Sequence, residues 1–239
     1  MKVNEDIAIS TSGVLLVPYD RRHVPTYHAW MEDEAVRAAT ASERLTLEEE
    51  YENQESWRSS GDKLTFIVCR PRRVDGDSSS TSSTSSAVVA GVDDAPGQMV
   101  GDINFFLTPY EEEDGTENGF AGEVDVMIAA LDDRGKGYGR AAVTAFLHYI
   151  LQRQRAAILA EASSASSASS FSSTVLRQLV VKIQATNAAS IGLFKSLGFV
   201  QRGGVNYFGE VELVRTDLTS DVPQGYTECV YQRDAADRS

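Results

Sequence analysis

Residues 123–151 constrain the fold of this chain more than any other stretch. They begin with alternating β-branched residues typical of a strand, continue through three glycines at Gly135, Gly137 and Gly139, and end in the apolar run 140–151, which is typical of a helix. Glycine allows a phosphate to approach the backbone closely, and the free N–H groups and dipole of a helix N-terminus favour negative charge. The order of strand, turn and helix therefore predicts an anion-binding site for a phosphate compound.

Charge narrows the class of partner. The chain has 239 residues, a net charge of −13 and a pI of about 4.7. General nucleic-acid binding requires a basic surface, so we expect no nucleic-acid partner. An acidic protein instead attracts a basic or amine-bearing partner. A hydrophobic content of 42% is sufficient for the core of one domain.

Cysteine usage and hydropathy point to a soluble protein of a reducing compartment. Cys69 and Cys229 are too few for a disulfide framework or a zinc site. No run of 18 apolar residues is present, and residues 1–6 are too polar for a signal peptide. We therefore expect no membrane association and a cytoplasmic location, with the nucleus also possible. The histidines show no metal-ligand spacing, so no metal is expected: His23, His28 and His148.

Strands and helices alternate along the chain, which indicates a mixed α/β domain. Thr46 and Glu49 form a capping-box pattern at the start of one helix. The predicted strands are 14–19, 64–69, 99–107, 123–131, 179–186, 199–201 and 205–218. The predicted helices are 23–33, 47–59, 139–155 and 188–196.

Two serine-rich segments interrupt this pattern. Residues 74–97 and about 160–174 are low in complexity and cannot bury enough apolar surface to offset their ordering entropy, so we expect disordered insertions. The domain is expected to cover 1–218. A loose polar tail is expected at 219–239, although residues 226–231 could dock.

Two motifs carry a family resemblance. Arg134-x-x-Gly137-x-Gly139, placed between a strand and a helix, resembles the acetyl-CoA pyrophosphate loop of the GNAT N-acetyltransferases. Residues 187–199, with Asn187 at the start and Gly-Phe at the end, are similar to a second helix motif of the same superfamily. Both motifs occur in the expected order on the expected elements.

The resemblance extends over about residues 1–218. The segments 40–51, 62–68 and 123–129 look like the eukaryotic N-acetyltransferase 9 subfamily, which is related to the ribosomal-protein-alanine acetyltransferases. The implied fold is α+β, with a mixed sheet of six or seven strands, about four flanking helices and two parallel strands that splay apart. The implied activity is acetyl-CoA-dependent transfer of an acetyl group to a protein or peptide amine.

The resemblance also implies a set of residues that bind acetyl-CoA. Backbone groups of Met127 and Ala129 would bond the pantetheine arm and polarise the acetyl carbonyl. Asn187 would bond the same arm or simply cap its helix. The full set is Met127, Ile128, Ala129, Arg134, Gly135, Lys136, Gly137, Tyr138, Gly139, Asn187 and Phe194.

The proton acceptor and donor are less constrained. Glu123 and Asp125 lie two apart on one strand, so both face one side, and either could take the proton from the amine or be an ordinary solvent-side residue. Phe194 occupies the position at which many GNAT enzymes have a tyrosine that acts as general acid and protonates the leaving thiolate. The acid would then be Tyr138, Tyr207 or water, or the thiolate would leave unassisted.

Phe194 keeps two further functions open. A chain without the tyrosine hydroxyl could be a scaffold that binds acetyl-CoA with little turnover, and acidic loops also suit acetylation of a small-molecule amine. The resemblance implies an acceptor site between residues 32–46 and the hairpin of Tyr207 and Phe208. Acidic residues such as Glu43 could attract a basic peptide there or merely be solvated.

Overall fold

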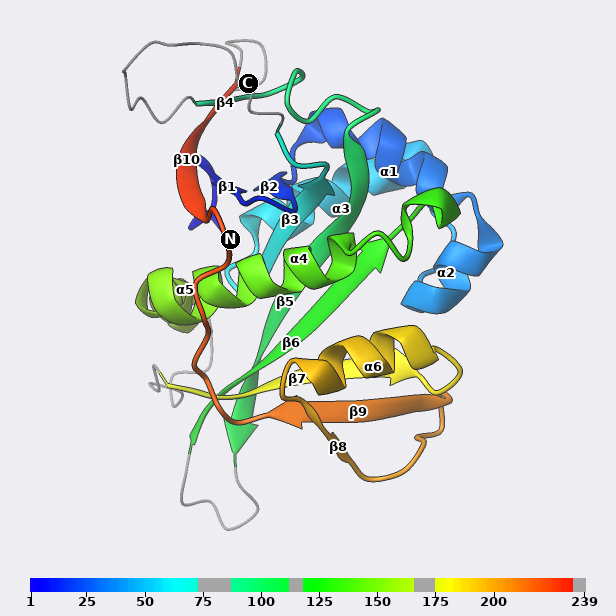
Figure 1. The fold of residues 1–239 in the computed structure, drawn as a ribbon, viewed down its shortest axis with the longest axis vertical. Helices are drawn as coiled ribbons and strands as arrows, with labels where there is room; N and C mark the ends of the chain where they lie inside the picture. Colours follow the sequence, from blue (N-terminus) through cyan, green and yellow to red (C-terminus); the bar gives the residue numbers. More distant parts are fainter. Residues whose placement is uncertain (73–86, 112–117, 166–174, 234–239) are drawn as a thin grey trace.

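The computed structural model describes residues 1–72, 87–111, 118–165 and 175–233. In this part of the chain ten strands form one sheet, in the order β4-β10-β1-β2-β3-β5-β6-β7-β9-β8 (Figure 1). The strands are β1 (Ile7–Ser10), β2 (Leu15–Pro18), β3 (Lys63–Cys69), β4 (Val88–Val89), β5 (Met99–Glu111), β6 (Asn118–Ile128), β7 (Leu176–Gln184), β8 (Val200–Arg202), β9 (Glu210–Arg215) and β10 (Thr227–Gln232). The mixed α/β architecture is confirmed.

The sheet has more strands than the six or seven predicted. β1, β4 and β10 were not among the predicted strands, and together they form one edge of the sheet. β10 pairs with β1 in antiparallel register and with β4 in parallel register, so the docking alternative for residues 226–231 is the one observed. Strand formation here depends on partners distant in sequence, which local patterns do not report.

Parts of both predicted disordered insertions have regular structure. Ala87 to Gln98 form an ordered turn that includes β4, and the buried side chain of Asp94 in this turn bonds His23. Residues 160–165 continue a helix. The remaining predicted insertion residues, 74–86 and 166–174, lie outside the described part of the chain.

Helices pack on both faces of the sheet. The capping box that starts α3 is confirmed: the amide of Thr46 donates to Glu49 at 2.7 Å, and the amide of Glu49 donates to the Thr46 hydroxyl. α2 was not among the predicted helices, and it begins after Asp33, whose side chain accepts the amide of Ala35 as an N-cap. The helices are α1 (Val24–Met31), α2 (Glu34–Thr40), α3 (Leu47–Ser59), α4 (Tyr138–His148), α5 (Arg155–Ala165) and α6 (Ala188–Ser196), with a π-helical turn at Tyr149–Arg153.

Two hydrophobic cores lie on opposite faces of the sheet. Phe66, Phe105 and Phe146 pack edge to face under α4, in a core that α5 and α6 share. Met127 and Ala129 of β6 belong to the other core, beneath α1 and α2. Alternate residues of β6 therefore face different helices.

β6 and β7 separate partway along their length. The two strands are parallel and pair from Phe120 with Leu176 up to Glu123 with Val180. Beyond that point β6 continues to Ile128 next to β5, whereas β7 continues to Gln184 next to β9. This separation is the predicted V-shaped splay.

Candidate acetyl-CoA site

The glycine-rich turn leads directly into α4. Gly135 and Gly137 have φ values of +74° and +91°, which L side chains rarely adopt, and a Cβ at either position would meet nothing within 4 Å. The first helical bond of α4 runs from the amide of Ala141 to the carbonyl of Gly137. The amides of Tyr138, Gly139 and Arg140 precede that bond and are available to an anion.

Basic side chains hold this turn in place. The Arg134 guanidinium donates to the carbonyls of Ile128 at 2.9 Å and Ala129 at 3.1 Å, which ties the turn to the end of β6. Asp133 is buried and pairs with Arg70 at 2.9 Å and Lys136 at 3.4 Å. Because Arg134 is bonded to β6, its predicted contact with the pyrophosphate stays a prediction, and its observed role is to position the turn.

A cavity of about 670 Å³ adjoins the start of α4. Its cations are partly neutralised, since Arg70 bonds Asp133 and Arg72 bonds Asp93 at 3.2 Å. It is lined by Ser12, Arg70, Pro71, Arg72, Val92, Asp93, Gly97, Gln98 and Tyr138.

The backbone register of β6 revises one sequence assignment. The amide of Ala129 donates to the carbonyl of Val100 at 2.9 Å, so this amide is used within the sheet. Residues of an antiparallel strand direct their backbone groups to alternate sides, and Met127, which pairs with Asp102, is therefore also directed to β5. The open side of β6 beyond Glu123 presents the amides of Val126 and Ile128 instead. These two groups replace those of Met127 and Ala129 as candidates to bond an acetyl carbonyl.

The two candidate bases have different surroundings. Glu123 forms an ion pair of 2.6 Å with Lys182 across the last paired positions of β6 and β7. Asp125 lies two residues further on, inside the splay, and is half-buried. Burial, and then the charge of Glu123, raise the pKa of Asp125 to about 6. Asp125 is therefore the better base of the two near neutral pH.

The sequence prediction missed a second carboxyl group beside Asp125. Asp102 on β5 is 2% exposed, and its Oδ2 accepts from the Nδ2 of Asn104 at 2.9 Å and the hydroxyl of Tyr27 at 3.4 Å. Burial, and then the Asp125 charge, raise the pKa of Asp102 to about 7. The signal was present in the sequence, because Asp102 and Asn104 interrupt an otherwise apolar strand at alternate positions.

The α6 residues have structural roles. The Asn187 side chain accepts the amide of Ser190 at 3.1 Å, which confirms the capping alternative. Phe194 is 2% exposed and packs edge to face on Phe199, so it offers an apolar wall and no proton. Contact of either residue with pantetheine stays a prediction.

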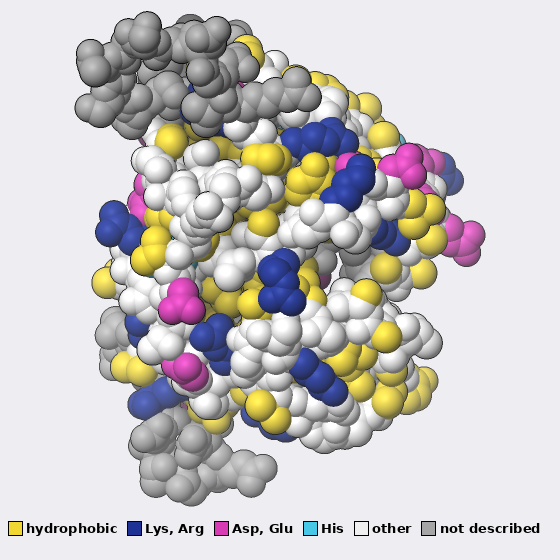
Figure 2. Space-filling view, viewed as in Figure 1, with side chains coloured by type: hydrophobic (Ala, Val, Ile, Leu, Met, Phe, Trp, Pro, Cys, Tyr) yellow, Lys and Arg dark blue, Asp and Glu magenta, His cyan; other side chains and the backbone are white. Residues whose placement is uncertain are grey.

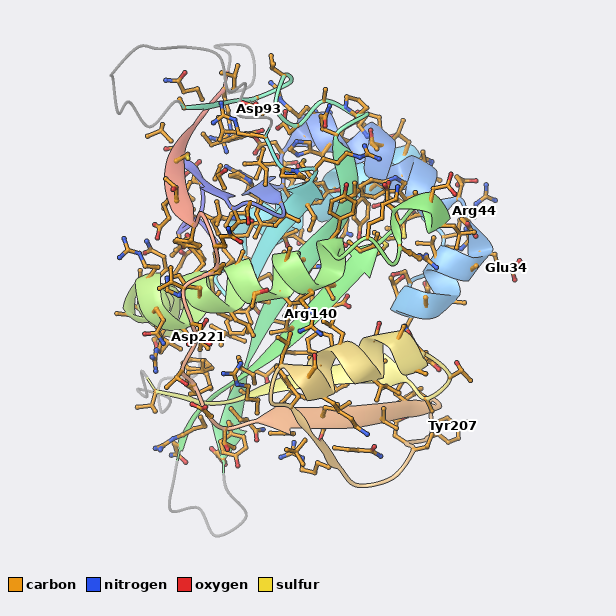
Figure 3. The ribbon with its side chains drawn as sticks, viewed as in Figure 1. Glu34, Arg44, Asp93, Arg140, Tyr207 and Asp221 are labelled. Carbon is orange, nitrogen blue, oxygen red and sulfur yellow. The ribbon has the colours of Figure 1, made fainter. Side chains whose placement is uncertain are left out.

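The candidate acids and the expected acceptor region lie at the rim. Tyr207 is 96% exposed on the connection between β8 and β9, and Tyr138 lines the cavity next to α4. Figure 3 shows Tyr207 on the same side of the molecule as Glu34, the first residue of α2, and Arg44, which follows that helix. Figure 2 shows the surface hollowed between the part that carries α1 and α2 and the part that carries α6 and β9. An acceptor amine could enter the splay there.

Acetyl-CoA fits the chemistry of this cleft. A pyrophosphate requires several backbone donors without crowding by side chains, and the turn at Gly135 and Gly137 leaves that space. An extended amide-containing arm requires a strand edge without a partner, and β6 has one beyond Glu123. The carboxyl groups of Asp125 and Asp102 lie on the α1 side of the same segment.

Comparison with known proteins agrees with this arrangement. Residues 14–200 match the family model "Acetyltransferase (GNAT) domain". The chain is 40% identical over 215 residues to "Alpha/beta-tubulin-N-acetyltransferase 9" of Drosophila melanogaster, covering 90% of this chain and 89% of that protein. It is 37% identical over 213 residues to "N-acetyltransferase 9-like protein" of Dictyostelium discoideum, covering 89% and 86%.

A solved structure shares the fold. It is the spermidine N-acetyltransferase of Vibrio cholerae in complex with CoA and spermine, with a TM-score of 0.55 at 14% identity, covering 85% of this chain and 94% of that one. This chain belongs to the GNAT acetyltransferase family. It is accordingly an N-acetyltransferase with acetyl-CoA as the acetyl donor. Among the described residues no helix is long and apolar enough to cross a membrane.

Proposed function

We propose that this chain acetylates an amine of a protein, with tubulin as the first acceptor to test. The observation that carries the reaction is the splay of β6 and β7 next to the open N-terminus of α4. The protein acceptor is supported by the relative from Drosophila melanogaster, whose name specifies α/β-tubulin.

Different groups of the chain bind the cofactor, stabilise charge and accept the proton. Acetyl-CoA supplies an activated acetyl group as a thioester. The amides at the start of α4 hold the pyrophosphate, and those of Val126 and Ile128 face the strand gap in which negative charge develops on the acetyl oxygen. The carboxylate of Asp125 takes a proton from the acceptor ammonium, and the freed amine then attacks the thioester carbon.

Departure of the thiolate requires no side-chain acid in this proposal. Phe194 has no proton, Tyr207 is at the exposed rim, and Tyr138 lines the neighbouring cavity. A thiol has an ordinary pKa of about 8.5, so its anion is a competent leaving group that water can protonate. The lost tyrosine hydroxyl is therefore compatible with turnover.

The acceptor is proposed to carry positive charge near its amine. The first turn of α3 carries Glu48, Glu49 and Glu50, and the net charge of the chain is −13. Such a field raises the encounter rate with a cation, more strongly at low salt. The same field would also suit a polyamine, so the acceptor panel must include one.

The test is an acetyl-transfer assay read by mass spectrometry. The purified protein and acetyl-CoA are incubated with the α/β-tubulin dimer, with basic peptides whose N-termini are free or blocked, and with spermidine. We expect transfer to tubulin or to free peptide amines, and its loss in Asp125→Asn. Transfer to spermidine alone would replace the protein acceptor with a small molecule. Binding of acetyl-CoA without transfer to any amine would contradict the proposal.

A further inference from the structure

A group of polar side chains lies on one face of β5 and β6 where the splay begins. The register pairs Asp102 with Met127 and Asn104 with Asp125, so these side chains project from the same face of the sheet. Asp102 and Asp125 are diagonal neighbours across the two strands, which places such side chains within mutual reach. This face is the one covered by α1, because Tyr27 reaches Asp102 from that helix.

The two carboxyl oxygens of Asp102 differ in their hydrogen bonding. Its Oδ2 accepts two bonds, from Asn104 and Tyr27, whereas its Oδ1 is buried and has no partner among the described residues. An ionised carboxylate oxygen that is buried without a donor is costly. A proton on Oδ1 lowers that cost, since it neutralises the buried group.

The charged groups around this pair are mostly acidic. Tyr27 of α1 and Tyr19, which directly follows β2, lie beside Asp102. Glu50 of α3 lies beside these two tyrosines, with His28 next to it. From β6 the pair faces Glu123, whose charge is paired with Lys182 of β7. Burial and neighbouring negative charge therefore favour retention of one proton by the two carboxyl groups.

We propose that Asp102 and Asp125 form a carboxyl pair that shares one proton near neutral pH, in which Asp125 is the base and Asp102 sets its proton affinity. This inference rests on the proposed acetyl transfer. Asp102 is a positioning residue, since it lies beneath the cleft and acts through Asp125. Such pairs titrate in two steps that belong to both groups.

The step balances as follows. The ionised Asp125 takes one proton from the acceptor ammonium, and the nitrogen lone pair forms a bond to the acetyl carbon. The carbon–sulfur bond breaks with its electron pair on sulfur, and the second proton lost by nitrogen ends on the thiolate through water. Asp125 then returns its proton to solvent, so the net products are the amide, CoA thiol and one proton.

The first experiment is a pH profile of kcat/KM for wild type, Asp102→Asn and Asp125→Asn. We expect Asp125→Asn to lose about 10²-fold to 10⁴-fold at every pH. Asp102→Asn leaves Asp125 beside a group that cannot ionise, so the profile should lose its second, higher-pH step and become a single titration. Asp94→Asn is the matched control, because Asp94 is also buried but bonds His23 and Tyr231 on the far side of β1 and β2. Asp94→Asn should lose stability and keep the two-step wild-type profile.

If Asp102 had only a structural role, Asp102→Asn would behave like Asp94→Asn. If Asp102→Asn lowers kcat/KM at all pH values and leaves the two-step shape of the profile unchanged, the proposal is overturned. The same holds if Asp125→Asn retains wild-type kcat/KM.

The second experiment does not depend on activity. Carboxyl ¹³C NMR of aspartate-labelled protein should show two coupled titrations, which collapse to one in either Asn variant. Independent one-step titrations near the ordinary aspartate value would overturn the pair. Coupled titrations in a protein that acetylates no acceptor would overturn the base role and the proposed function, while showing that the pair itself exists.

Discussion

Gly137 offers the sharpest test of the anion site. It caps α4 with φ +91° and ψ −3°, a conformation that costs an L-residue about 1–2 kcal/mol. A Cβ there would touch nothing within 4 Å, so Gly137→Ala introduces backbone strain and no clash. The variant either pays this strain or rotates the turn to negative φ, which redirects the amides of Tyr138 and Gly139.

Both responses are measurable. If the turn of Gly137→Ala keeps its positive φ, each kcal/mol of strain should lower the melting temperature by about 2–4 °C for a chain of this size. If the turn rotates instead, the amides of Tyr138 and Gly139 no longer point at the pyrophosphate. Acetyl-CoA binding should then weaken by about tenfold to a hundredfold, the equivalent of one lost hydrogen bond to a charged group. Isothermal titration calorimetry with CoA gives the affinity, and differential scanning calorimetry gives the stability.

Gly192→Ala, in α6, is the control for Gly137→Ala at the start of α4. Gly192 lies inside α6, and a Cβ there also meets nothing within 4 Å. Alanine in a helix interior is favoured over glycine by about 1 kcal/mol, so this variant should melt higher and bind CoA as wild type does. Wild-type affinity and wild-type stability in Gly137→Ala would refute the assignment of the turn as the pyrophosphate site.

Substitutions at Asn187, Tyr231 and Asp102 test other parts of the structure. Asn187→Ala should lose about 1 kcal/mol as a helix cap, whereas Asn187→Asp should retain it; weaker CoA binding by Asn187→Asp at unchanged stability would reveal a direct contact. Tyr231→Phe removes the hydroxyl that donates to buried Asp94 and should cost about 1.5–3 kcal/mol in urea unfolding, whereas Tyr207→Phe at the exposed rim should be neutral. Asp102 has a folded-state pKa of about 7, well above its unfolded value, so the stability it contributes is complete below about pH 4 and is lost as pH rises through 7. Asp102→Asn should therefore gain stability relative to wild type between pH 5 and pH 8, on the order of 1.4 kcal/mol per unit of pKa shift, and a constant difference would contradict the shift.

Local chemistry made much of the site predictable from sequence. The positive φ angles at Gly135 and Gly137, the cap at Asn187 and the capping box at Thr46 follow from residues close together in the chain. Each depends on a backbone conformation or bond that few residue types can provide. Such features are visible before any pairing of strands is known.

The features that were missed depend on pairing between distant strands. The sequence shows that residues 124–129 alternate, but only the bond from Ala129 to Val100 shows which set faces β5. Asp102 is of interest because it lies beside Asp125 on the neighbouring strand, and β10 forms a strand because it pairs with β1. A short window of sequence can mark Asp102 as an unusual polar residue in an apolar strand, but it does not show which residues of another strand lie beside it.

The pairing of β1 with β10 also bears on how the molecule reaches its native state. Ile7 lies opposite Val230, more than 200 residues later in the chain. Contacts at such separation form only after a large loop-closure cost has been met, so they are slow and late. During synthesis β1 must wait for almost the entire chain before its outer edge is covered. Until then that edge is exposed to strands of other molecules, which makes the interval before β10 docks the period of greatest risk of aggregation.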